Sequence, residues 1–467
     1  MKIPFSPVTR ISGLLSVDLF TGSSGTVIEA NVIGEQFRGF EAMLRGRKVT
    51  DAVYFTQRVC GICSMAHGYT AARMVERIYG IEPPPEVILL QQAMLGAEYL
   101  QNYIRHFYLL ALPDYLDATP IINFPAPGGP SPEKSRFTPA QQQFLMEHYL
   151  ASMEASRKCH EMLAVFGGKI PHQHGLTGAG VTVFPDTERR IQFLSLLQQV
   201  QGFIQQIMLP DVYLLAEVYP DYLTIGSGPG TFLSYGLFDP RFGGHFPAGV
   251  WNGGQLLLVD PTKITENITF AWYEKKDAET SPAPEKPGAY TWVKAPRYQG
   301  LPCEGGPLAR KIISGLHHGS ALPSATGSNS GDATGVMARL LARVEEATLI
   351  SGWILDWIKN LPQNGDYISP LEKPVLSQAF YANEAPRGPL LHSVSVSGET
   401  ITSYDIITPS EWNFSPKDET GARGPAETAL IGSKTEPGNP VEPGRIIRSF
   451  DPCLSCATHM ISVERRA

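Results

Sequence analysis

The sequence has little charge, few cysteines and no long hydrophobic run. Only 18% of its 467 residues are charged, and 38 Lys and Arg against 45 Asp and Glu give a formal net charge of −7. Because the chain also lacks a run of basic residues, its composition excludes electrostatic binding of nucleic acid or of an anionic membrane surface. Apolar residues make up 43% of the chain, enough for a large buried core.

The sequence also shows no apolar run typical of a membrane-spanning helix or of a secretory signal. The longest nearly apolar stretches, Leu349–Ile358 and Tyr108–Pro113, are shorter than the roughly 20 residues that cross a bilayer. The N-terminal residues up to Arg10 lack the apolar segment and cleavage site of a secretory signal. We therefore expect no transmembrane segment and no targeting signal in the chain. Its location would be cytoplasmic, or membrane-associated or periplasmic if a signal-bearing partner exports it.

Hydrophobic periodicity predicts a small β element followed by long helices. Leu14–Phe20 and Thr26–Ile33 alternate like strands, and the turn at Gly22–Gly25 between them predicts a hairpin. Thr138 before Pro139 is a typical helix start. Four long helices are expected, enough for a central bundle, over Ile88–Leu112, Pro139–Phe166, Glu188–Val218 and Ala333–Lys359.

Two zones rich in Gly and Pro separate or follow the helices. Gly226–Pro307 contains strand-like pieces at Gln255–Val259 and Gly288–Val293, and Asn413–Pro443 precedes the last cysteines. Such zones are usually surface loops that wrap around a core. The predicted fold class is mainly α with a smaller β part (α+β). We expect a single domain over residues 1–467, made of a β-rich element (1–50), a helical core (51–225), a loop- and β-rich insertion (226–310), a second helical part with the last cysteines (311–459) and a tail (460–467).

The six cysteines are too few and too unevenly spaced for a disulfide scaffold. Four of them form two Cys-x-x-Cys pairs at opposite ends of the chain, Cys60 with Cys63 and Cys453 with Cys456. Thiolates at this spacing share a metal ion or form a redox pair. The spacing alone is equally compatible with a structural zinc site or with two unrelated pairs.

The residues around the two pairs are more specific. The segments Arg58-Val59-Cys60-Gly61-Ile62-Cys63 and Asp451-Pro452-Cys453-Leu454-Ser455-Cys456-Ala457-Thr458-His459 together resemble the large, catalytic subunit of nickel–iron hydrogenases. The resemblance covers essentially the whole chain and includes Pro7–Arg10, Arg38–Glu41, Gly167–His172 and Glu384–Gly388. The related subunit of respiratory NADH:quinone oxidoreductase has lost the thiolates, so their presence argues against that relative.

The resemblance implies a nickel ion held by the four thiolates. Cys63 and Cys456 would also bridge to an iron that carries cyanide and carbon monoxide, and Cys60 and Cys453 would be terminal ligands. The implied reaction is the reversible heterolytic cleavage of H₂ to two protons and two electrons. Cys453 would be the first proton acceptor, because a metal-bound sulfur keeps lone pairs.

Three charged residues are expected to shape the gas site. By the family pattern Arg387 would lie over the metals, held by Asp114 and Asp451. Two of them have a simpler interpretation: Asp451 could cap a helix that begins at Pro452, and Arg387 could form a surface ion pair. His67, four residues after Cys63, is either a core histidine or a support behind the ligands.

A second metal site is implied at the C-terminal end. Glu41 and His459 fit the family's magnesium (sometimes iron) site, which prefers oxygen and imidazole ligands. A solvated Glu and a frayed terminal His are the alternatives. The family's precursor is cut after this histidine, so Met460–Ala467 would be a cleavable tail removed by an endopeptidase among the maturation proteins.

One residue departs from the family pattern. Where the family usually has Thr-Arg-Ile-Glu-Gly, this chain has Ser12 in place of the Glu. That carboxylate normally relays the proton away from the terminal cysteine, and a hydroxyl cannot store a proton near neutral pH. The second functional hypothesis is therefore an H₂-sensing regulatory subunit with low turnover.

Electrons have to leave through a partner. Only Cys159 and Cys303 remain after the four metal ligands, and two cysteines cannot hold a [4Fe–4S] cluster. Both are expected to be buried and inert. The resemblance implies an iron–sulfur small subunit that docks near the first cysteine pair.

Overall fold

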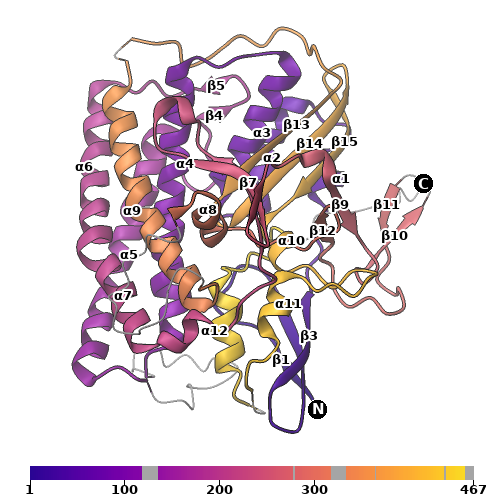
Figure 1. Ribbon diagram of the computed structural model, residues 1–467. Coiled ribbons are helices and arrows are strands. Elements are labelled where there is room, and N and C mark those ends of the chain that lie inside the picture. Colours follow the sequence, from indigo (N-terminus) through magenta and orange to yellow (C-terminus); the bar gives the residue numbers. More distant parts are fainter. Residues whose placement is uncertain (118–134, 277–278, 317–332, 363, 436–437, 458–467) are drawn as a thin grey trace.

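The computed structural model describes residues 1–117, 135–276, 279–316, 333–362, 364–435 and 438–457. A bundle of long helices occupies one side of the molecule and small sheets with short helices occupy the other (Figure 1). The bundle contains α4 (Pro85–Arg105), α5 (Pro139–Gly167), α6 (Thr187–Phe203), α7 (Leu209–Val218) and α9 (Val336–Asn360). This arrangement confirms the predicted α+β class.

Helix α4 is the centre of the bundle and is buried along almost its whole length. Its Gly96 allows close approach to α9, because a Cβ at this position would lie 2.8 Å from the side chain of Ile354. The predicted helix over Ile88–Leu112 is confirmed in outline. Its last part widens into a π-helix at His106–Ala111 and ends in a 3₁₀ turn at Leu112–Asp114.

The other predicted helices also form. Thr138 caps α5, since its side chain accepts from the backbone N–H of Gln141 in a capping box. The helix expected over Glu188–Val218 is interrupted by a π-helix at Ile204–Met208, and α7 follows. Pro210 explains the break, because proline has no N–H to donate to the preceding turn.

Short antiparallel sheets carry the rest of the fold. The predicted hairpin is confirmed as β2 (Leu15–Thr21) and β3 (Val27–Gly34), and the unforeseen β1 (Lys2–Phe5) pairs with β2. A second sheet has the order β13 (Gln378–Ala385), β14 (Gly388–Ser397), β15 (Thr400–Ile407). A third has the order β6 (Thr231–Leu237), β7 (Phe246–Asn252), β8 (Gln255–Leu257).

The remaining elements are short, apart from α3 (Ser64–Tyr79). The helices are α1 (Phe40–Leu44), α2 (Ala52–Thr56), α8 (Pro307–Ile313), α10 (Pro409–Asn413), α11 (Pro425–Leu430) and α12 (Val441–Ser449). The strands are β4 (Leu176–Thr177), β5 (Gly180–Val181), β9 (Ile264–Asn267), β10 (Tyr273–Lys276), β11 (Glu279–Pro282) and β12 (Ala295–Tyr298).

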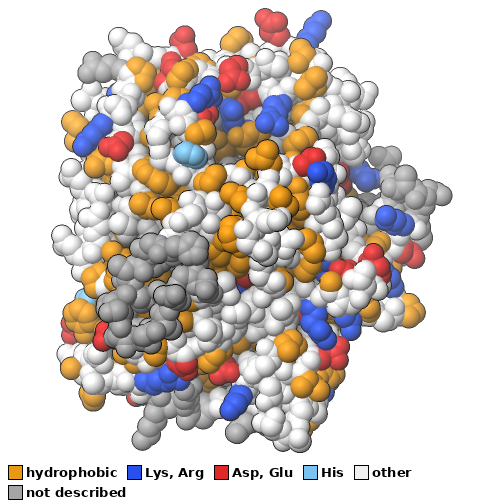
Figure 2. Space-filling view, viewed as in Figure 1, with side chains coloured by type: hydrophobic (Ala, Val, Ile, Leu, Met, Phe, Trp, Pro, Cys, Tyr) orange, Lys and Arg blue, Asp and Glu red, His pale blue; other side chains and the backbone are white. Residues whose placement is uncertain are grey.

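Two expectations for the Gly- and Pro-rich zones were wrong. Gly288–Val293 contains no strand, because only Thr291 forms an isolated bridge, to Ala271. Asn413–Pro443 is not only surface loop: α11 within it is mostly buried against β3. The face in Figure 2 shows hydrophobic side chains around β7 and α8. Strand β8, which pairs with β7, exposes Leu256 and Leu257, and Leu258 directly after it is also exposed.

One hydrophobic cluster joins the two ends of the chain. It runs from Ile3 in β1 to Ala457 and includes the buried face of the helix bundle. The cysteines Cys60, Cys63, Cys453 and Cys456 belong to it, so the two pairs meet in the core. None of the helices in the described residues is long and apolar enough to cross a membrane.

Candidate metal centre

The two cysteine pairs converge into one group of four buried sulfur atoms. The sulfurs of Cys60 and Cys453 are 3.4 Å apart, those of Cys63 and Cys456 are 3.4 Å apart, and those of Cys453 and Cys456 are 2.9 Å apart. All four lie within 4.8 Å of one another, close enough to share metal ions. The pairing crosses 393 positions of sequence.

Turns at helix ends direct the thiols toward one another. Cys63 directly precedes α3, whose first-turn N–H groups of Met65 and Ala66 donate to the buried carboxyl of Glu98 at 2.6 and 2.8 Å. Burial raises the pKa of Glu98 to about 8. Cys453 follows α12 after Asp451, which has a left-handed backbone with φ of 58°.

Arg38 ties the two cysteine segments together. Its guanidinium donates to the carbonyls of Arg58 (3.0 Å) and Val59 on one side and of Ser455 (3.0 Å) on the other. In the sequence, Arg38 stands out only as part of the segment Arg38–Glu41 that resembles the family. Its role depends on carbonyls from both ends of the chain, which only the fold brings together.

The N-terminal segment packs on the second cysteine pair. The N–H of Ser12 donates to the carbonyl of Pro452 at 3.2 Å, and the N–H of Leu454 donates to the carbonyl of Ser12 at 2.7 Å. Gly13 has φ of +87°, and a Cβ there would lie 2.5 Å from the backbone nitrogen of Ser455. Residue 12 therefore lies beside Cys453. The position where the family usually has a Glu, and this chain has Ser12, is next to Cys453.

The four thiols cannot all ionise without a cation. Hydrogen bonds from the other three thiols, Cys453 first, hold the pKa of Cys60 well below its usual value. The contact with Cys453 holds the pKa of Cys63 well above its usual value. Burial, followed by the contacts with the other thiols, does the same for the pKa of Cys456. Since like charges this close repel strongly, four thiolates require compensating positive charge. The donor set fits soft or borderline metals.

Arg387 supplies one buried positive charge at this centre. Its Nη2 is 3.0 Å from Oδ1 of Asp451, and its Nε donates to the Asp451 carbonyl at 2.9 Å. Burial opposes the charge, but Asp451 and the thiols hold the pKa of Arg387 above its usual value. Burial likewise opposes the carboxylate of Asp451, but Arg387 holds the pKa of that group below its usual value.

The prediction that Asp114 holds Arg387 was wrong. Asp114 forms ion pairs with Arg10 and, at 2.8 Å, with Arg448 instead. The place beside Arg387 is taken by Asn102 on α4, with its amide oriented to accept from both terminal nitrogens of Arg387 (3.0 and 3.2 Å) and to donate to Asp451 (3.0 Å). Nothing in the sequence near Asn102 singled it out, because its partners lie hundreds of residues away.

Asp451 does not cap a following helix. No helix begins at Pro452 in the described residues, since Cys453 forms an isolated bridge and residues 454–456 form a turn, and Asp451 itself follows α12. The surface interpretation of Arg387 is also wrong, since its exposed fraction is 3%. Its loop is fixed by buried Arg310, which pairs with Glu346 at 2.8 Å and with Glu384, and donates to the carbonyl of Pro386 at 3.2 Å.

A small cavity separates the thiols from Arg387. It measures about 10 Å³, near the least space that holds a water-sized molecule. The lining residues are Cys63, His67, Ala385, Arg387, Pro409, Ser410, Cys453 and Cys456. A molecule here would contact both a guanidinium and sulfur, which is suited to polarising a small gas.

Glu41 is a buried carboxyl and not a solvated surface residue. It is buried in α1, its Oε1 accepts from the N–H of Ile406 at 2.9 Å, and its Oε2 has no partner among the described residues. Burial raises the pKa of Glu41 to about 7, while the nearby charge of Lys294 opposes this rise. His459 and Met460–Ala467 lie outside the described residues.

The remaining cysteines lie away from the four-thiol group, as expected. Cys159 and Cys303 are buried, and burial raises the pKa of both, that of Cys303 to about 12. High pKa values keep thiols protonated and inert.

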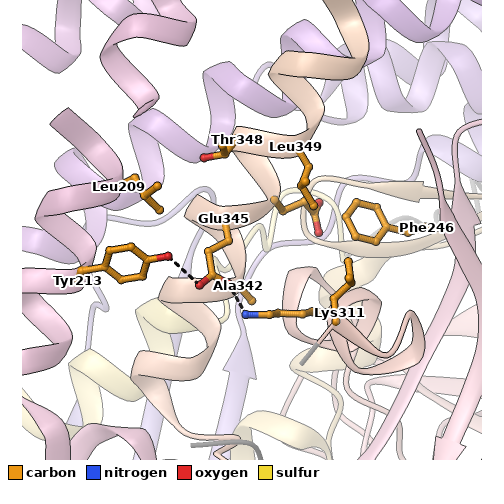
Figure 3. A pocket seen from close by; sticks show the side chains of 10 residues that line it. Leu209, Tyr213, Phe246, Lys311, Ala342, Glu345, Thr348 and Leu349 are labelled. Atoms are coloured by element: carbon orange, nitrogen blue, oxygen red, sulfur yellow. Dashed lines mark hydrogen bonds and ion pairs between the residues drawn. The ribbon is translucent and has the colours of Figure 1, made fainter. Parts of the chain in front are cut away.

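A larger cavity lies between α7, α8 and α9. It measures about 300 Å³, and Figure 3 shows Tyr213 and Lys311 both reaching Glu345 across it. Its walls are mostly apolar and include Leu209, Phe246 and Leu349. It contains none of the predicted site residues.

Comparisons with known proteins agree with this centre. A family model described as nickel-dependent hydrogenase matches residues 38–127 and 130–459. The periplasmic [NiFeSe] hydrogenase large subunit of Desulfomicrobium baculatum is 32% identical over 99% of this chain and 96% of that protein. The Hydrogenase-1 large chain of Escherichia coli is 26% identical, over 98% of this chain and 95% of that protein.

Solved structures agree over the same length. The Ni-Fe-Se hydrogenase of Desulfovibrio vulgaris Hildenborough superposes with a TM-score of 0.92 at 34% identity, over 98% of this chain and 100% of that one. A reduced, active form of the Desulfomicrobium baculatum enzyme gives 0.92 at 32% identity, over 98% and 100%. In this chain all four ligand positions are cysteine. The chain belongs to the nickel-dependent hydrogenase family and is a large, catalytic subunit of a hydrogenase.

Proposed function

We propose that this chain catalyses the reversible heterolytic cleavage of H₂ at a nickel–iron centre held by Cys60, Cys63, Cys453 and Cys456. The observation that carries the proposal is the buried guanidinium of Arg387, which Asp451 fixes and which lines one small cavity together with three of the four thiols. A structural zinc site is closed by its four ligands, so it needs neither an adjacent cavity nor a buried cation facing the thiols. The bound metals would supply the Lewis-acid and redox chemistry that polarises H₂ and takes up its electrons.

The residues of the chain have distinct roles in this proposal. Cys60, Cys63, Cys453 and Cys456 would hold the metals, Cys63 and Cys456 would serve both the nickel and the iron, and the iron would carry cyanide and carbon monoxide. Arg387 polarises H₂ from the opposite side of the cavity, and it stays charged because guanidinium is not deprotonated in proteins. Cys453, as a terminal ligand beside the cavity, accepts the first proton.

Glu41 is proposed as a ligand of magnesium or iron, together with His459. Its buried and unpartnered Oε2 fits a hard cation, which would compensate the carboxylate. Glu266 and Asp405 also act on Glu41 electrostatically, against a single ammonium group, Lys294. This excess of negative charge favours a divalent ion at this position.

The electron acceptor is proposed to be an iron–sulfur small subunit. The described cysteines outside the centre, Cys159 and Cys303, are too few for a [4Fe–4S] cluster. Maturation proteins would build the metal centre, and an endopeptidase would remove Met460–Ala467. A signal on the small subunit would place the pair at the membrane or in the periplasm. The name of the Desulfomicrobium baculatum relative describes it as periplasmic, which supports this location.

Infrared spectroscopy of the chain purified with its partner tests the proposal. We expect carbon monoxide and cyanide stretching bands that shift when H₂ is admitted. A fully processed chain that holds zinc and shows no such bands would exclude a nickel–iron centre.

A second candidate function is an H₂ sensor with low turnover. The observation in its favour is Ser12, which lies beside Cys453 where the family usually has Glu. Without a carboxylate there, the proton on Cys453 has no acidic group at residue 12 to receive it. In this case the infrared bands would still respond to H₂, but turnover would stay low.

A further inference from the structure

The carboxyl group of Glu98 on α4 caps the neighbouring helix α3 from outside. Its Oε1 accepts from the N–H of Met65 at 2.6 Å, and its Oε2 accepts from the N–H of Ala66 at 2.8 Å. Met65 and Ala66 are the second and third residues of α3, where backbone N–H groups have no acceptor within the helix. Glu98 has an exposed fraction of 1%, so it meets this need in the core.

Cys63 occupies the position whose side chain ordinarily makes these bonds. It is the N-cap of α3, and its carbonyl accepts from the N–H of His67 at 3.3 Å. The side chain of an N-cap residue usually accepts from the N–H of the second or third helical residue. The side chain of Cys63 makes no such bond, and its backbone ψ of 38° differs from the extended conformation typical of an N-cap.

The sulfur of Cys63 is directed to the metal centre instead, where it lies 3.4 Å from the sulfur of Cys456. The other cysteine of the pair differs, because the sulfur of Cys60 accepts from the backbone N–H of Ile62 at 3.3 Å. A hydrogen bond to a thiolate withdraws electron density that the sulfur would otherwise donate to a metal. The two sulfurs are therefore prepared differently, and Cys63 is the one proposed to serve both metals.

We propose that Glu98 is a positioning residue that takes the N–H groups of Met65 and Ala66 and so keeps the sulfur of Cys63 free to bind the metals. It acts through the first turn of α3. The N-terminal end of a helix carries partial positive charge and attracts an anionic sulfur, and the carboxyl group of Glu98 offsets this attraction. The inference rests on the proposed function in that the thiolates hold the metals.

Glu98→Gln is the informative variant because it keeps the size of the side chain and halves its accepting capacity. A carboxyl group offers two oxygens, whereas an amide offers one oxygen and an NH₂ group that cannot accept. One of the two N–H groups then loses its partner inside the core. The sulfur of Cys63, in the usual place of a capping acceptor, is available to replace it.

X-ray crystallography of the complex with its small subunit tests the proposal. In the wild type we expect both oxygens of Glu98 within hydrogen-bond distance of the Met65 and Ala66 nitrogens, and the sulfur of Cys63 bonded to neither. In Glu98→Gln that sulfur should move toward one of these nitrogens and away from Cys456. A wild-type sulfur of Cys63 that accepts from either N–H would overturn the proposal, even if the variant does not fold.

Infrared spectroscopy of the same proteins separates positioning from packing. In Glu98→Gln we expect the carbon monoxide band to move to higher wavenumber, because a hydrogen-bonded sulfur donates less electron density to the iron. The matched control is Glu427→Gln, which alters a buried carboxyl that accepts the N–H of Val32 at 3.0 Å and should leave the band in place.

The two measurements also distinguish this inference from the proposed function. A wild type without carbon monoxide and cyanide bands would contradict the nickel–iron centre, while the distances around Cys63 would still decide the role of Glu98. An unchanged sulfur position and an unchanged band in a folded Glu98→Gln protein would overturn the proposal for Glu98 alone.

Discussion

Arg387 and Asp451 form a buried ion pair of 3.0 Å, and Arg387 lines the small cavity together with three of the four thiols. The contact is doubled, because the Asp451 carbonyl also accepts from Nε of Arg387 at 2.9 Å. Asp451 reaches this position through a left-handed backbone with φ of 58° between α12 and Cys453. The same residue therefore turns the chain toward the thiols and fixes the cation that faces them.

Replacing the proposed proton acceptor should abolish function. In Cys453→Ala we expect loss of nickel and a fall in H₂ turnover of at least about a hundredfold, because both a ligand and a base are removed. Elemental analysis and an H₂-uptake assay measure the two effects. Cys303→Ala, which removes a buried thiol elsewhere, should keep its nickel. Wild-type turnover in Cys453→Ala would contradict the assignment.

Neutralising the partner of Arg387 should destabilise the protein. Asp451→Asn keeps the shape but leaves the guanidinium without its carboxylate, which for a buried pair costs about 3–5 kcal/mol. The midpoint of thermal unfolding should fall accordingly. Glu154→Gln serves as the control, because the pair of Glu154 with Arg157 is exposed and its loss should not change the midpoint measurably.

Asn102 and Asp114 should have different effects. Asn102→Leu removes hydrogen bonds to Arg387 and Asp451, so we expect turnover to fall by roughly tenfold or more, from about 1–3 kcal/mol of lost interactions. Asp114→Asn weakens the ion pairs to Arg10 and Arg448 and should lower stability while the folded fraction keeps its turnover. The opposite result, with activity lost only in Asp114→Asn, would restore Asp114 as the partner of Arg387.

One buried carboxyl away from the centre should make stability depend on pH. Burial raises the pKa of Glu427 in α11 from 4.5 to about 7, although Val32 N–H and the Tyr290 hydroxyl donate to it. Because the folded state binds the proton more tightly, its contribution to stability is full below about pH 4.5 and is lost as the pH rises toward 7. The free energy of unfolding between pH 4 and 8 should therefore depend less on pH in Glu427→Gln, by at most about 1.4 kcal/mol per pH unit. An unchanged pH profile would show that Glu427 is ionised in the folded protein.

Restoring the carboxylate at residue 12 distinguishes enzyme from sensor. Ser12→Glu places an acid beside Cys453, so a large gain in turnover would show that the proton relay is impaired in the natural chain. Ser12→Gln, of the same size but unable to hold the proton, is the control. Equal turnover in all three proteins would mean that protons leave by another route.

The sequence by itself determined the parts of this protein that depend on neighbours in the chain. The long helices, the first hairpin and the cap at Thr138 were predictable, because periodicity and capping act within a few residues. The two cysteine pairs were also visible, since ligands three positions apart form a local pattern. Their metal and chemistry came from the resemblance to a family.

Only the tertiary structure decided which distant residues meet. Asn102 takes the place expected for Asp114, and His67 is linked to His392 across 325 positions. Glu41, which the sequence pointed to only through the family resemblance, has one buried oxygen without a partner in the described part of the chain. Such contacts depend on how the whole core packs. Because the free energy of burial is spread over many side chains, the sequence around any one of these residues does not indicate its distant partner.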